Sequence, residues 1–147
     1  MFSINARLDI QLSPDDILAH YGMDTGGRLQ QVLDQRVIDY CTDGGYVPAS
    51  PERTLEFSAQ LSTEIGSGKV IWNTPYARYQ YYGLVMTDEA GRTWVGPGET
   101  KPVITDRPLI YDTAQNDRAG SYWFERMKAD RLNDILDELR RVAKQGV

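Results

Sequence analysis

The feature that most constrains the fold is a long amphipathic segment near the end of the chain, residues 121–145. Its apolar residues recur every three or four positions, the spacing of one face of an α-helix. They are Trp123, Phe124, Met127, Leu132, Ile135, Leu136, Leu139 and Val142. Ser121 can cap the first turn, and basic residues lie near the C-terminal end, where the helix dipole favours them. We expect a helix of about 22–24 residues, about 33 Å long.

The first two thirds of the chain predict both strands and helices. Residues 2–12 alternate between apolar and polar side chains, which predicts a half-buried strand. Its apolar positions are Phe2, Ile4, Ala6, Leu8, Ile10 and Leu12. A short helix should follow, capped by Ser13 and closed by Gly22. Residues 29–41 have clear helical periodicity, and residues 52–65 suit a second helix.

The region after residue 65 returns to strand character. We expect a strand around residues 70–72 and a hairpin over residues 84–96 that turns at Glu89–Gly91. Residues 103–112 are extended, but Pro108 confines them to an edge or a bend. This order of elements predicts an α+β domain: a mostly antiparallel sheet with helices packed on one face and a long C-terminal helix.

The size and composition of the chain are those of one globular domain. The chain has 147 residues, of which 41% are hydrophobic and 25% charged, so we expect a single domain over residues 1–147. Residues 84–112, rich in Gly and Pro, should form a protruding loop or hairpin. No apolar run approaches the roughly 18 residues of a membrane span. The first residues lack the features of a secretion signal, so we expect a soluble protein made in a cytoplasm, without a membrane partner.

The sequence lacks the residues and motifs on which several classes of enzyme depend. Cys41 is the single cysteine and falls on an apolar helix face, and His20 is the single histidine. The chain contains no GxSxG elbow, P-loop or GxGxxG motif. Its carboxylate pairs fall in turns or on polar helix faces. We therefore expect no enzyme, and no catalytic, cofactor-binding or metal-binding residues. The net charge of −5 without a basic stripe also argues against specific nucleic-acid binding.

The segment "NTPYARYQYYG", residues 73–83, contains four of the nine tyrosines. Some of its rings can fill the core, and for Trp72, Tyr76 and Tyr82 we weigh a core position and a surface position equally. In a helix after Pro75, Tyr81 points away from the face of Tyr76, Tyr79 and Tyr82. Tyrosine gives a large rigid contact at low entropic cost and is enriched in protein interfaces. A carbohydrate platform is the alternative, although only Asn73 and Gln80 flank the rings.

Two motifs resemble a known family. "VIWNTPYARYQYYG", followed some forty residues later by "AGSYWFERMKADRLNDIL", is similar to the minor capsid proteins of the head–tail joining cluster of siphophages. Broader relatives are tail-completion or neck proteins. The resemblance spans roughly residues 10–140. It implies a structural virion protein at the neck, assembled in the host cytoplasm into a ring of identical copies. It also implies contact with other connector or tail proteins, and transient passage of DNA.

Subunit contacts or a structural cluster should involve the aromatic residues and the small residues between them. Ala77 lets a turn pack closely, and Gly83 permits positive φ. Trp123 and Phe124 should be core, whereas Tyr122 is free to meet a partner. The full set is Trp72, Tyr76, Ala77, Tyr79, Tyr81, Tyr82, Gly83, Trp94, Tyr122, Trp123 and Phe124. Two other functions compete: a carbohydrate- or cell-wall-binding module on the same aromatics, and a small enzyme built around His20 and two carboxylates.

Overall fold

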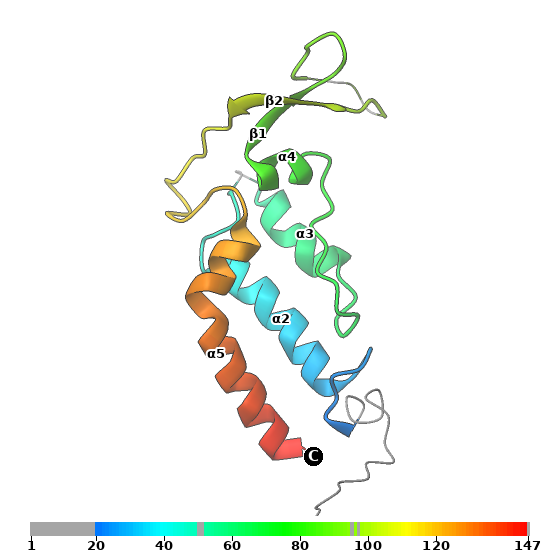
Figure 1. The fold of residues 1–147 in the computed structure, drawn as a ribbon, viewed down its shortest axis with the longest axis vertical. Coiled ribbons are helices and arrows are strands. Elements are labelled where there is room, and N and C mark those ends of the chain that lie inside the picture. Colours follow the sequence, from blue (N-terminus) through cyan, green and yellow to red (C-terminus); the bar gives the residue numbers. More distant parts are fainter. Residues whose placement is uncertain (1–19, 50–51, 95, 97, 147) are drawn as a thin grey trace, which may run out of the picture.

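The computed structural model describes residues 20–49, 52–94, 96 and 98–146. The elements are α2 (Arg28–Asp43), α3 (Thr54–Ser62), α4 (Ala77–Tyr82), β1 (Leu84–Thr87), β2 (Val103–Pro108) and α5 (Trp123–Gly146). The long helices α2 and α5 lie side by side and run in opposite directions, and the strands extend beyond one end of them (Figure 1). The expected strand at residues 2–12 and most of the short helix before Gly22 lie outside the described residues.

The long C-terminal helix is confirmed, with 24 residues. It begins at Trp123, so the residue before it is Tyr122 and not Ser121. The Arg126 backbone N–H donates to the Tyr122 carbonyl at 3.0 Å, the first bond of the helical series. Ser121 was therefore wrong as the N-cap by one position. Tyr122 takes this place with a φ of 49°, in the left-handed region.

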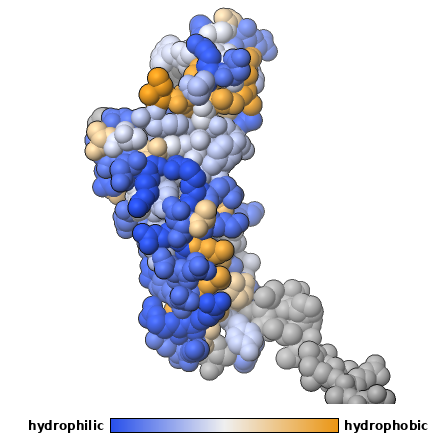
Figure 2. All heavy atoms as spheres, turned by 60° about the vertical axis from the view of Figure 1, so that its left-hand side comes forward, coloured by the Kyte–Doolittle hydropathy of each residue, from blue (hydrophilic) through white to orange (hydrophobic). Residues whose placement is uncertain are grey.

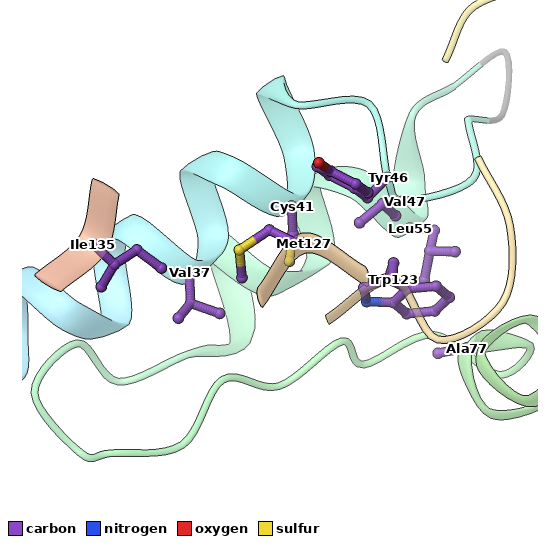
Figure 3. Packing of buried hydrophobic residues seen from close by; sticks show 9 residues of the cluster. All are labelled: Val37, Cys41, Tyr46, Val47, Leu55, Ala77, Trp123, Met127 and Ile135. Carbon is purple, nitrogen blue, oxygen red and sulfur yellow. The ribbon is translucent and has the colours of Figure 1, made fainter. Parts of the chain in front are cut away.

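The core lies between helices. Trp123 and Met127 of α5 are almost completely buried against Cys41 of α2 and Leu55 of α3 (Figure 3). The α+β class is confirmed, since the described chain combines helices with an antiparallel strand pair. However, the core cluster contains no residue of β1 or β2. The strands are an extension of the helical body, and we call residues 84–112 the arm.

Two strand predictions were wrong in detail. Residues 70–72 form no strand; Val70 and Trp72 pack against the core, and the Ile71 N–H donates to the Thr63 hydroxyl at 3.0 Å. This segment therefore packs against the core and does not pair with another strand.

The hairpin partner is also different. The turn after β1 forms as expected, with the Gly91 N–H bonded to the Asp88 carbonyl at 3.0 Å. β1 then pairs antiparallel with β2, and the described residues among 92–96 are in no strand. The run Val103–Pro108 is longer, and Pro108 ends it as an edge strand should.

Two buried carboxylates hold the loops to the helices. Asp34 of α2 is 3% exposed and accepts the backbone N–H groups of Gly66 and Gly68 at 2.8 and 3.0 Å. Glu56 of α3 is 1% exposed and accepts from the Asn116 amide, in the loop before α5, at 3.3 Å. The Asp34 bonds attach the loop that leads to α4, so they help to position the aromatic residues described next.

Candidate interaction surface

The aromatic residues form an inner layer centred on Trp123, which is 1% exposed. The ring of Tyr81 meets it edge-on at 4.7 Å, and the ring of Trp72 at 5.6 Å. Tyr76 and Phe124 are partly buried against the same cluster. Trp123 therefore has the predicted core position, and Tyr81 packs against the core cluster together with Tyr76.

Ala77 and Gly83 play the parts that the sequence predicted. Ala77 is 8% exposed and belongs to the core cluster. Gly83 has a φ of 75°, which glycine adopts without strain. A Cβ at this position would lie 2.8 Å from the Cβ of Ser121, so glycine also permits the close approach of the chain to the start of α5.

Two tyrosines lie on the surface above this layer. Tyr82 is 46% exposed and Tyr122 is 45% exposed, and their ring centroids are 6.0 Å apart. Both rings also contact Tyr81, at 5.6 and 5.3 Å. Tyr82 thus takes the surface position of the two that we weighed. We call Tyr82 and Tyr122 the surface tyrosine pair; it is fixed from beneath by Tyr81 and, through it, by Trp123.

The backbone of Tyr122 is strained. A non-glycine residue with positive φ costs on the order of 1 kcal/mol, and such residues persist only where the surroundings hold them. Here the Tyr122 N–H donates to the Tyr81 carbonyl at 2.8 Å. The chain therefore keeps a large, half-exposed ring at a position where Asn or Gly would adopt this φ with less strain.

A second feature is a groove between α4 and the arm, with a volume of about 960 Å³. Pro75, Arg78 and Tyr79 line one side; Met86, Trp94 and Lys101 line the other. The Lys101 ammonium lies 4.4 Å from the centre of the Tyr79 ring, a cation–π contact, and burial raises the pKa of Tyr79. Trp94 is 76% exposed and shares this groove with Tyr79, so it does not cover Tyr81 or Tyr82.

The titratable groups that we considered for a small enzyme make the following contacts. His20 is exposed and its ring contacts that of Tyr21. Cys41 is completely buried, and burial raises the pKa of its thiol to about 12. Asp88 binds the side chain of Arg92 within the turn after β1. Within the described ranges, no three His, Cys, Asp or Glu side chains are grouped so that they could hold a metal ion.

None of the described helices combines the length and the apolar character needed to cross a bilayer.

Sequence reasoning missed the exposed apolar side chains of β2. Val103 is 40% exposed and Ile104 52% exposed, and Figure 2 shows apolar residues gathered at the strand end of the molecule. The signal was present: the segment was recognised as an edge strand, and an edge strand with adjacent Val and Ile cannot bury both faces.

Comparison with known proteins gave no match to any family model, any curated protein or any solved structure.

Proposed function

We propose that this chain is a structural protein of a phage virion. It is a head–tail connector component that assembles with copies of itself into a ring between the portal side and the tail. The observation that supports this most directly is the surface tyrosine pair. Interface hot spots are aromatic anchors held rigidly before binding, and Tyr82 and Tyr122 are held by a layer of rings beneath them.

The strain at Tyr122 supports the same conclusion. Natural chains retain a strained residue where its side chain is needed in one position. For folding alone, Asn at position 122 lowers the backbone penalty. A tyrosine whose ring is 45% exposed and whose φ is 49° is better explained by a contact outside the chain.

A ring requires heterologous contacts, in which two different surfaces of one copy meet the next copies. The surface tyrosine pair and the arm are the two surfaces that we assign to this role. Other connector or tail proteins contact the ring on either side of it. DNA passes through without specific binding, since a net charge of −5 limits adhesion of phosphates to the pore.

The location is tested on purified virions by quantitative mass spectrometry and by immunogold labelling against this chain. We expect a few copies per particle, labelled at the neck. A chain that is absent from virions, or distributed over the capsid surface, contradicts the proposal.

The contact is tested by truncating the pair, as Tyr82→Ser with Tyr122→Asn. Because hot-spot truncation costs about 2 kcal/mol or more, self-association should weaken about thirtyfold or more in sedimentation velocity. Tyr21→Ser is the matched control, since Tyr21 is 49% exposed but lies near the start of α2. Thermal unfolding checks that each variant is folded. Unchanged association of the double variant rejects the role of the pair.

The arm groove favours a second candidate function, a carbohydrate- or cell-wall-binding module. Trp94 is 76% exposed beside Tyr79, and a half-exposed aromatic wall can bind a sugar face. On this function, the purified chain sediments with host cell walls, and Trp94→Ala abolishes the binding. If the chain stays in the supernatant, the groove has no such role, and the connector remains.

A further inference from the structure

We propose that residues 2–12 of one copy add a third strand to the free edge of β2 in the neighbouring copy. This inference rests on the proposed function, and it specifies which segment joins the copies. The acceptor is the outer edge of β2; the donor is the alternating segment at the start of the chain.

The acceptor edge is open. In the described part of the chain the sheet has two strands, and five of the six residues of β2 are exposed. A two-stranded ribbon is marginally stable alone, and an unpaired edge presents free N–H and C=O groups. The arm therefore has an incomplete sheet that contains exposed Val103 and Ile104.

One face of the sheet at this edge is apolar. Ile104 lies opposite Met86 in the β1–β2 register, so the two side chains share one face of the sheet. Met86 is 4% exposed and lines the groove, whereas Ile104 is 52% exposed. A third strand with apolar side chains on this face would cover Ile104 and continue the apolar surface that begins at Met86.

The donor has the required pattern. Residues 2–12 alternate strictly, with six apolar and five polar side chains. In strand addition, backbone hydrogen bonds provide the affinity, and every second side chain contacts the same face of the sheet and fixes the register. A segment with a strict period of two places all its apolar side chains on that face. The eleven residues span about 36 Å, more than enough to cover β2.

We assign the donor and the acceptor to different copies. α2 begins at one end of the helical body, and the arm lies beyond the opposite end of α2 (Figure 1). The 16 residues of α2 alone measure about 24 Å. We therefore assign the donor to the neighbouring copy.

The contact is tested with a fluorescent peptide of residues 1–14. The receptor is the full chain with Leu8→Asp and Ile10→Asp, which blocks its own donor segment and leaves β2 unchanged. We expect saturable binding by fluorescence anisotropy. Ile104→Lys in the receptor should weaken it about tenfold or more, since charged edge residues oppose strand addition.

Two controls make this result specific. Ile110→Lys should leave the affinity unchanged, because Ile110 is 98% exposed but lies outside β2. A peptide with Asn5→Asp and Gln11→Asp keeps the apolar face and should still bind. Absence of saturable binding, or binding that ignores Ile104→Lys, overturns the inference.

Mixing two full-length variants tests the direction of the contact. The Leu8→Asp, Ile10→Asp chain keeps its acceptor, and the Ile104→Lys chain keeps its donor. Each should fail to form rings alone, and together they should form 1:1 dimers that grow no further. If the Leu8→Asp, Ile10→Asp chain forms rings and enters virions like the wild type, this inference fails and the proposed function stands. If the wild type is absent from virions, the proposed function fails whatever the peptide does.

Discussion

Burial determines the chemistry of individual side chains in the core of this chain. Cys41 is completely buried, and its thiol pKa is raised to about 12 because the thiolate would lose its hydration. Asp34, equally inaccessible, keeps a polar role because three donors meet it: Gln30 and the backbone of Gly66 and Gly68. The same helix therefore buries one inert sulfur and one fully bonded carboxylate.

The thiol of Cys41 should be unreactive in the folded protein. At pH 8 a group with a pKa of about 12 is ionised in about one molecule in ten thousand, and only the thiolate attacks. We expect reaction with an aromatic disulfide reagent to be at least about a hundredfold slower in native protein than in guanidinium. Cys41→Ala with Thr113→Cys, which moves the thiol to an exposed loop, is the control and should react at once. Fast native reaction of Cys41 contradicts this.

Asp34→Ala should release the loop around residues 66–68. Two backbone donors and the Gln30 amide lose their acceptor, which costs about 2–3 kcal/mol of unfolding free energy. Denaturant unfolding measures the loss, and hydrogen exchange should accelerate at Gly66 and Gly68. Asp43→Ala, an exposed carboxylate of the same helix, should change stability by less than about 0.5 kcal/mol. Equal effects of the two substitutions would show that the loop is held by other contacts.

At the scale of elements, the junction between α4 and β1 decides where the arm points. α4 ends at Gly83, whose φ of 75° reverses the chain into β1. The Leu109 N–H donates to the Gly83 carbonyl at 2.8 Å, so the return of the arm is attached at the same residue. One glycine thus connects the helix, both ends of the arm and, through Ser121, the start of α5.

Gly83→Ala should be strongly destabilising. The left-handed backbone costs an alanine about 1 kcal/mol, and its Cβ would meet Ser121 at 2.8 Å, for a total of about 2 kcal/mol or more. Gly91→Ala is the matched control: its φ is 83°, but nothing lies within 4 Å of the added Cβ. It should lose the backbone part alone. Adding Ser121→Gly to Gly83→Ala should recover part of the stability in thermal unfolding; no recovery would show that the clash is not what destabilises the variant.

At the scale of the whole molecule, α2 and α5 are joined by more than apolar packing. The Arg36 Nε donates to the Glu138 carboxylate at 2.6 Å, between residues 102 positions apart in the chain. This bond lowers the pKa of Glu138 from its ordinary value of 4.5. Arg36 also binds Asp39 at 2.7 Å, so its position is set from both helices.

The contribution of Glu138 should depend on pH. Because its folded-state pKa is lowered, the stabilisation is present above about pH 4.5 and is lost as the pH falls through the folded-state value. Glu138→Gln should cost about 1 kcal/mol at pH 7, since Arg36 is partly exposed, and the difference from wild type should vanish in acid. Urea unfolding between pH 2.5 and pH 7 measures it. Asp137→Asn, which removes an exposed pair with Arg140 within α5, should have little effect at any pH.

Local properties of the chain could be predicted from the sequence. The apolar period of residues 123–142 determined a long helix, because a helix repeats every 3.6 residues whatever it packs against. The burial of Cys41 followed from the same kind of period. The positive φ of Gly83 followed from the conformational freedom of glycine at the end of a short helix.

The tertiary structure decided how distant segments meet. β1 pairs with β2 across a loop of 15 residues, and residues 70–72 pack against the core and form no strand. Tyr82 and Tyr122 became neighbours although 40 positions separate them, because Tyr81 packs on Trp123 at the start of α5. Periodicity reports which face of an element is apolar, but the partner of that face depends on the packing of the whole core. The sequence by itself therefore determined the helices and the turn residues; only the fold decided which rings remained at the surface.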